Sequence, residues 1–184
     1  MIKNLLALSF SLISIVAISQ DNTGITNSLE DKNELKVNGL FLILGAIEVD
    51  YQYLINDESG IGIDVLLAFD DYNLDINYAV SPYYRQYFGK KRAAGFFVEG
   101  FGMLNSTDDY FYDETYDATT QTFSYNYGTD TVVDFALGIG TGVKLLTKRG
   151  FIVEIDLGIG RNLFKTDRDY TIIGKGGVHL GYRF

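Results

Sequence analysis

Apolar and polar residues alternate with a period of two through most of this 184-residue chain. Between residues 153 and 160, for instance, the odd positions hold Val, Ile, Leu and Ile, and the even positions hold Glu, Asp, Gly and Gly. Successive side chains of a β-strand point to opposite faces of a sheet, so this pattern predicts strands with one apolar face. A helix would need apolar residues three and four positions apart, and no segment keeps that spacing over its length.

Turn-forming residues divide the alternating region into eight predicted strands. The strands are expected at 34–44, 46–55, 60–69, 75–88, 95–104, 131–147, 151–161 and 170–184. Short turns alternate with longer connections along the chain, apart from a tight turn at Gly45. This regularity is typical of an up-and-down meander that closes into a barrel. We therefore predict an all-β protein, an eight-stranded antiparallel up-and-down barrel.

The polar face of these strands combines glycine with sparse charged residues of both signs. A solvated sheet surface would be broader in composition, whereas this face suits a barrel interior, which eight strands make just wide enough for side chains to fill. Unpaired charges inside would be costly, so we expect an interior charge network in a filled barrel. Its predicted members are Lys36, Glu48, Asp50, Asp64, Arg85, Glu99, Asp134, Lys144, Glu154, Asp156, Lys175, His179 and Arg183.

Large aromatic side chains share the inward parity of two predicted strands. Tyr83 and Tyr87 do so in 75–88, and Phe97 and Phe101 in 95–104. Glycine on the polar face would leave room for such side chains from the opposite wall of the barrel. These aromatic residues argue against an open channel, although the inward charges keep a narrow pore or transporter for small solutes as an alternative function.

The apolar face fits a lipid environment. Strands that cross a membrane at a tilt need about 9–11 residues, which the predicted segments provide. Aromatic residues gather near the segment ends, as expected at the two membrane interfaces; they include Tyr51, Tyr53, Phe69, Tyr84, Phe88, Phe151, Tyr170, Tyr182 and Phe184. The barrel is therefore predicted to be transmembrane, with membrane lipid as its surroundings.

The first residues have the composition of a secretory signal peptide. Lys3 precedes a short apolar run over 5–18, and small residues at Ala17 and Ser19 form a cleavage site. The alternative is a buried or membrane-spanning helix, for which the run is short. We expect a signal peptide at 1–19, a flexible polar segment at 20–33 and the barrel at 34–184, exported to the bacterial outer membrane.

The chain ends inside a strand, and residues 178–184 read VHLGYRF. With KVNGLFLILGAIEVDYQYLIN and YYRQYFGKKRAAGFFVEG earlier in the chain, this ending resembles the small outer-membrane β-barrel proteins of Gram-negative bacteria, with an architecture like that of OmpX and the OmpA barrel. The resemblance includes a group of uncharacterised function. It implies that the barrel-insertion machinery reads an insertion signal formed by Val178, Leu180, Tyr182 and Phe184.

Several kinds of chemistry are unavailable to this chain. It has no cysteine and a single histidine, so thiol catalysis and multi-histidine metal sites are excluded, and we expect no cofactor. The formal net charge of −9 argues against nucleic acid as a partner. An enzyme would have to use His179, with Ser81 as a possible nucleophile at the same inward parity. We predict a non-catalytic outer-membrane barrel with a structural or surface-recognition role.

The segment 105–130 is acidic, rich in tyrosine and free of Lys and Arg. Alternating aromatic residues indicate that the flanking strands extend beyond the membrane as a hairpin that turns near 114–120. A solvated acidic loop or a Ca²⁺ site are the alternatives to recognition of an extracellular protein or glycan, and the spacing matches no EF-hand. The predicted recognition residues are Asp109, Tyr110, Tyr112, Asp113, Glu114, Tyr116, Tyr125 and Tyr127.

Overall fold

The computed structural model describes residues 31–70, 74–117, 122–164 and 171–184. The predicted signal peptide and most of the predicted flexible segment lie outside these residues. Asn33, which we expected at the end of that flexible segment, is instead the first residue of a strand. Within the described ranges, no helix is long and apolar enough to cross a membrane.

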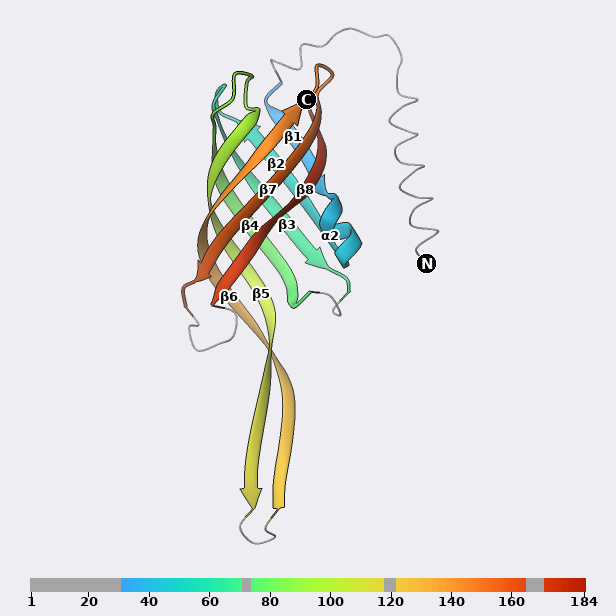
Figure 1. The fold of residues 1–184 in the computed structure, drawn as a ribbon, viewed down its shortest axis with the longest axis vertical. Coiled ribbons are helices and arrows are strands. Elements are labelled where there is room, and N and C mark those ends of the chain that lie inside the picture. The colour runs from blue at the N-terminus through green and yellow to red at the C-terminus, as the bar shows by residue number, and fades with distance from the viewer. Residues whose placement is uncertain (1–30, 71–73, 118–121, 165–170) are drawn as a thin grey trace, which may run out of the picture.

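Eight antiparallel strands form a closed barrel in the order β1 to β8 (Figure 1). The predicted fold class is therefore confirmed. The strands are β1 (Asn33–Asn38), β2 (Ala46–Leu54), β3 (Ser59–Ala68), β4 (Ile76–Tyr87), β5 (Gly95–Asp117), β6 (Thr122–Leu146), β7 (Phe151–Asn162) and β8 (Ile172–Arg183). Closure joins the first strand to the last, and Glu34 of β1 lies opposite Arg183 of β8.

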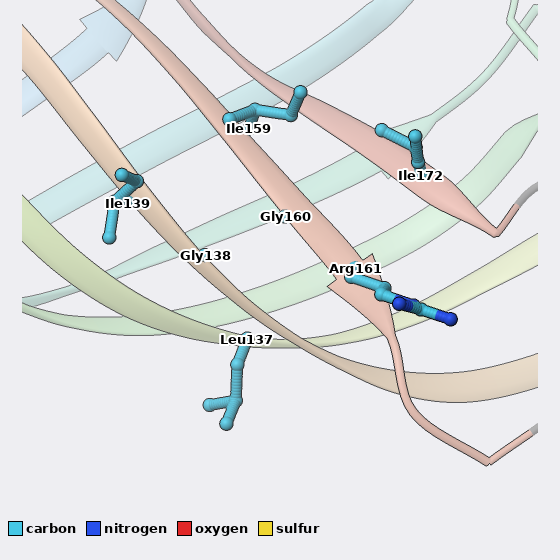
Figure 2. A pocket seen from close by; sticks show the side chains of 7 residues that line it. All are labelled: Leu137, Gly138, Ile139, Ile159, Gly160, Arg161 and Ile172. Atoms are coloured by element: carbon cyan, nitrogen blue, oxygen red, sulfur yellow. The ribbon is translucent and has the colours of Figure 1, made fainter.

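The two faces of the wall follow the predicted alternation. Charged and aromatic side chains of one parity are buried inside, and aliphatic and aromatic side chains of the other parity are exposed on the outside. The outer face includes the aromatic residues expected near the strand ends; Tyr170 lies outside the described residues. A shallow apolar groove crosses this outer face along β6, β7 and β8, between Leu137, Ile139, Ile159 and Ile172 (Figure 2).

Glycine accommodates the interior aromatic rings in a different way from the one we expected. Phe101 lies directly opposite Gly138 on the adjacent strand, and a Cβ atom added to Gly138 would approach the Phe101 ring to 2.2 Å. Tyr83 has the same relation to Gly62, at 2.3 Å. The rings therefore lie across glycines of neighbouring strands, and the expectation that glycine makes room for the opposite wall was wrong.

The predicted strand 34–44 is interrupted. The chain leaves the sheet after Asn38 and forms the short helix α2 (Gly39–Leu44). The Asn38 side chain accepts hydrogen bonds from the Leu40 and Phe41 N–H groups, and Gly45 ends the helix in the left-handed conformation at φ 101°. These two caps stabilise a six-residue helix where the strand was expected to continue.

The helix occupies a place in the wall that β1 does not reach. The β1–β8 pairing ends at Asn38 and His179, although β8 begins at Ile172. The Asn38 side chain bridges the remaining gap, because its Nδ2 donates to the Gly176 carbonyl at 3.3 Å and its Oδ1 accepts from the Val178 N–H at 3.3 Å.

The two ends of the barrel differ. The carboxy terminus and the short β2–β3, β4–β5 and β6–β7 turns lie at one end, and a long hairpin of β5 and β6 leaves the other (Figure 1). β5 has 23 residues and β6 has 25, whereas the longest of the other strands has 12. The two strands pair without a break from Gly95↔Lys144 to Asp117↔Thr122.

Candidate functional site

Glu154 of β7 lies at the centre of the charged interior. Its Oε1 is 2.7 Å from Nη1 of Arg85 and 3.1 Å from Nζ of Lys36, and its Oε2 is 3.4 Å from Nζ of Lys144. All four side chains are fully buried. One carboxylate thus bridges cations supplied by β1, β4 and β6.

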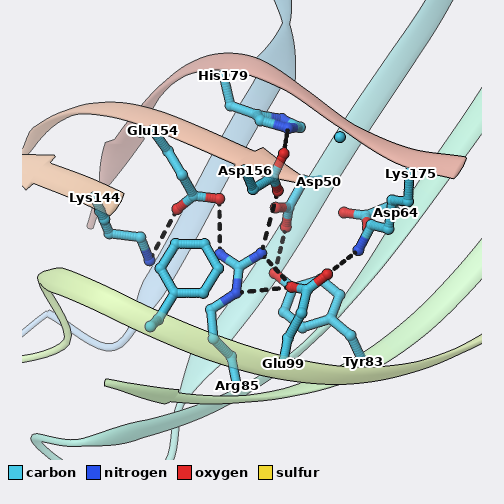
Figure 3. Close-up of polar contacts among 12 residues, drawn as sticks. Asp50, Asp64, Tyr83, Arg85, Glu99, Lys144, Glu154, Asp156, Lys175 and His179 are labelled. Carbon is cyan, nitrogen blue, oxygen red and sulfur yellow. Dashed lines mark hydrogen bonds and ion pairs between the residues drawn. The ribbon is translucent and has the colours of Figure 1, made fainter. Parts of the chain in front are cut away.

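Each of these cations also has a second carboxylate. Lys36 Nζ lies 2.6 Å from Asp50 Oδ2, and Arg85 Nη2 lies 2.7 Å from Glu99 Oε2. From Glu99 the network continues to Lys175 at 2.9 Å and then to Asp64 at 2.5 Å (Figure 3). Opposite charges therefore alternate across the interior, as the cost of burying an unpaired charge requires.

The network closes at the end with the short turns. Glu34 accepts from Lys144 Nζ at 2.6 Å and lies 2.6 Å from Arg183 Nη2. The Arg183 guanidinium also donates to the carbonyls of Arg92 and Ala93 in the β4–β5 turn, at 3.1 and 2.9 Å. The carboxy-terminal strand is thus fixed to a distant turn from inside the barrel.

Sequence reasoning left several interior residues out of the network. Glu34 and Gln52 share the inward parity of predicted members on their own strands, and this signal could have identified them. Gln52 accepts from Lys144 at 2.9 Å and exchanges hydrogen bonds with the Tyr87 hydroxyl. Tyr83 donates to Asp50 at 2.7 Å, so the interior tyrosines are polar partners as well as fillers.

Four predicted members of the network occupy more peripheral positions. Glu48 accepts from Asn38 Nδ2 at 2.5 Å, and Asp156 lies 3.2 Å from His179 Nε2 and 3.7 Å from Arg85. Asp134 accepts from the backbone N–H groups of Phe135 and Phe164 at 2.7 and 3.1 Å. This residue caps backbone near the base of the long hairpin and lies opposite Asn105.

Within the described residues, no group of three or more His, Asp or Glu side chains is arranged to hold a metal ion. His179 is buried, and its imidazole faces the Asp156 carboxylate in the packed interior (Figure 3). Arg85 is also enclosed by rings, with its guanidinium 3.9 Å from the Phe97 centroid and 4.6 Å from that of Tyr83. The geometry fits a filled, cross-linked barrel.

The long hairpin carries a separate candidate site. We call residues 108–117 and 122–131 the ribbon; in the β4–β5 pairing, the last residue of β5 is Thr107. Each strand of the ribbon has ten residues, so at about 3.3 Å per residue the ribbon extends roughly 30 Å from the barrel. The predicted hairpin is present, and its strands stay paired as far as Asp117↔Thr122, beyond 114, where the turn was expected to begin; residues 118–121 lie outside the described residues.

One face of the ribbon is aromatic. Tyr112 contacts Tyr125 and Tyr127 with ring centroids 5.8 and 5.3 Å apart, and Tyr116 contacts Phe123 at 4.9 Å. All five rings are more than half exposed. Phe123 was missing from the predicted recognition set, although it follows the same alternation as its neighbours.

Carboxylates lie mainly on the β5 side of the ribbon. Asp113 and Glu114 are exposed, and Asp109 is half-buried opposite Asp130. Glu114 shares the aromatic face, whereas Asp113 lies on the other face. For Tyr110, the structure describes the backbone within β5 and its pairing with Thr129.

The residues of the predicted insertion signal line the outer wall. Val178, Leu180, Tyr182 and Phe184 are all exposed on the lipid-facing side. Phe184 exchanges backbone hydrogen bonds with Asn33 at 3.0 and 2.8 Å, so the last residue belongs to the closing seam.

Comparison with known proteins supports the architecture alone. No protein-family model matches the chain, and no characterised protein matches its sequence. The N-terminal β-barrel domain of OprF from Pseudomonas aeruginosa is similar in structure, with a TM-score of 0.51, 12% identity, and coverage of 84% of this chain and 98% of that domain. Neisserial surface protein A gives 0.43 at 10% identity, covering 83% of this chain and 95% of that one. Yersinia pestis Ail gives 0.36 at 12%, covering 84% and 100%. The chain thus has the fold of small outer-membrane β-barrel proteins.

Proposed function

We propose that this protein is a non-catalytic recognition barrel of the bacterial outer membrane, exported through a cleaved signal peptide. The filled barrel anchors the ribbon, and the ribbon binds an extracellular protein or glycan. The observation that carries this proposal is the exposed aromatic face of a hairpin that extends well beyond the other strands. Exposed aromatic clusters of this kind are a frequent mark of interaction surfaces.

The difference between the two ends of the barrel supports one orientation in the membrane. The short turns and the carboxy terminus face the periplasm, and the ribbon faces the outside of the cell, as is usual for barrels inserted from the periplasm. The outward residues Val178, Leu180, Tyr182 and Phe184 act during assembly, when the insertion machinery recognises the last strand.

A ribbon-less variant tests the proposed function. Residues 110–129 are replaced by an Asn-Gly turn, which joins Asp109 to Asp130 at a position where the strands already pair. Cells displaying the full chain and the variant are compared for retention on immobilised extracellular-matrix proteins and on a glycan array. Retention that depends on the ribbon supports the proposal, provided that heat-modifiable gel migration shows both proteins to be folded.

Equal retention of the two proteins on every surface would contradict ribbon-mediated recognition. The pore alternative is tested separately by planar-bilayer conductance of the purified protein. We expect no sustained single-channel steps, because ion-paired and aromatic side chains fill the interior. Such steps would contradict the role of the barrel as a closed anchor.

A further inference from the structure

We infer that the ribbon binds its partner by strand addition, and that the partner is an extended basic segment of a protein that pairs with the free edge of β5. This inference rests on the proposed function and specifies its partner. A two-stranded hairpin in water is marginally stable by itself, and its edges carry unpaired backbone groups. A third strand would satisfy one edge and widen the aromatic face.

Hydrogen bonds at the barrel define which backbone groups the free edges present. The Phe88 N–H donates to the Phe96 carbonyl at 2.8 Å, and the Asp108 N–H donates to the Asp75 carbonyl at 2.9 Å. The backbone N–H and C=O groups of even-numbered β5 residues therefore point toward β4. Because the β5–β6 register is unbroken, this alternation continues into the ribbon, where β4 is absent. The free edge of β5 thus presents the N–H and C=O groups of Tyr112, Glu114 and Tyr116.

The opposite edge follows from the same reasoning. The Leu163 N–H donates to the Phe135 carbonyl at 3.0 Å, so the backbone N–H and C=O groups of odd-numbered β6 residues point toward β7. Beyond the barrel, the free edge of β6 presents Phe123, Tyr125 and Tyr127. Glu114 and Tyr125 are direct cross-strand partners, and each exposes its backbone at a different edge.

Charge distinguishes the two edges. Asp113 and Glu114 place exposed carboxylates on both faces beside the β5 edge, whereas residues 123–129 of β6 carry no charge. Like charges on directly opposed strands are unfavourable, so the β5 edges of two copies would repel each other. A strand with Lys or Arg on both faces gains opposite-charge pairs instead, and Arg also stacks on Tyr112 and Tyr116.

The test uses the full chain folded in detergent micelles and a fluorescent nonapeptide of three Arg-Arg-Val repeats, which places arginine on both faces of an extended strand. A peptide of the same composition with alternating D- and L-residues carries the same charge but cannot extend as a regular strand. Binding is measured by fluorescence anisotropy. We expect the all-L peptide to bind at least tenfold more tightly than the D,L peptide; equal affinities would overturn the inference, because charge alone would then account for binding.

Two proline variants form a matched pair on the two edges. Glu114→Pro removes an outward N–H from β5, and Tyr125→Pro removes one from β6, and neither breaks a β5–β6 hydrogen bond. We expect Glu114→Pro to weaken binding of the all-L peptide at least tenfold and Tyr125→Pro to change it less than twofold. Glu114→Gln, which keeps the N–H, should weaken binding by two- to fivefold. The reverse order of the two proline variants would overturn the assignment to β5.

Hydrogen exchange of the unmodified protein provides a readout that does not depend on variants. The all-L peptide should protect the amides of Tyr112, Glu114 and Tyr116 and leave those of Phe123, Tyr125 and Tyr127 unchanged. Concentration-dependent protection of the β6 amides without peptide would show that a second copy occupies the ribbon, and would overturn the inference. If retention of cells depends on the ribbon but the peptide protects no amide, strand addition is rejected and the proposed function is kept. If the peptide protects the β5 amides but retention does not depend on the ribbon, the proposed function is rejected.

Discussion

Replacing Glu154 by glutamine removes a carboxylate that bridges three buried cations. Its oxygens lie 2.7 Å from Arg85, 3.1 Å from Lys36 and 3.4 Å from Lys144. Removing one member of a buried ion pair typically costs about 3–5 kcal/mol. Each cation keeps a second carboxylate at 2.6–2.7 Å, namely Asp50, Glu99 or Glu34, so we expect the lower end, about 3 kcal/mol.

The measurement is urea unfolding of the protein in lipid vesicles, with the folded fraction read from heat-modifiable gel migration. Asp57→Asn is the matched control, because Asp57 pairs with Arg92 at 3.0 Å but is 80% exposed. A surface pair is worth about 0–1 kcal/mol. The Glu154→Gln/Lys36→Met double variant should lose less than the sum of its single variants, since removing a cation relieves the charge imbalance. Equal losses for Glu154→Gln and Asp57→Asn would refute the central role of Glu154.

Three further predictions concern glycine packing, the wall gap and assembly. Gly138→Ala places a Cβ 2.2 Å from the Phe101 ring and should cost about 1–3 kcal/mol in the same unfolding assay, whereas Gly100→Ala, with no atom within 4 Å, should be neutral. Asn38→Ala removes the α2 cap and leaves Glu48 without its amide donor, for a loss of about 2 kcal/mol; Asn56→Ala in an exposed turn is the control. Phe184→Ala should lower the folded amount in cell membranes and leave refolding in vesicles unchanged, and the exposed Phe88→Ala should change neither quantity. Equal effects within any of these pairs would contradict its explanation.

The strands could be predicted because a period of two is a local property of the sequence. The same parity identified buried charges as far apart as Lys36 and Arg183 without any knowledge of their neighbours. Their partners could not be predicted, because pairing depends on register and closure. Glu34 and Arg183 are 149 positions apart and meet only because β1 pairs with β8.

Helix α2 was missed for a different reason. Residues 40–44 are all apolar and do not alternate, so periodicity cannot distinguish a strand from a helix there. The cap signals were present in Asn38 and Gly45, which are separated by the six residues of the helix. They outweigh the weak β preference of Gly-Leu-Phe-Leu-Ile-Leu, which includes a single β-branched residue.

β5 and β6 contribute side chains to the barrel interior and also continue into the ribbon. Glu99 of β5 lies between Arg85 and Lys175, and Lys144 of β6 lies between Glu34 and Glu154, so contacts across the interior fix β5 and β6 within the barrel, and their unbroken pairing carries this register into the ribbon. Apolar residues of similar volume often stabilise an interior at least as well as buried ion pairs do, and in some proteins buried polar groups serve instead to fix the register. A fixed register keeps Tyr112, Glu114 and Tyr116 at one defined edge. Binding by strand addition then needs less ordering of the ribbon, which favours affinity.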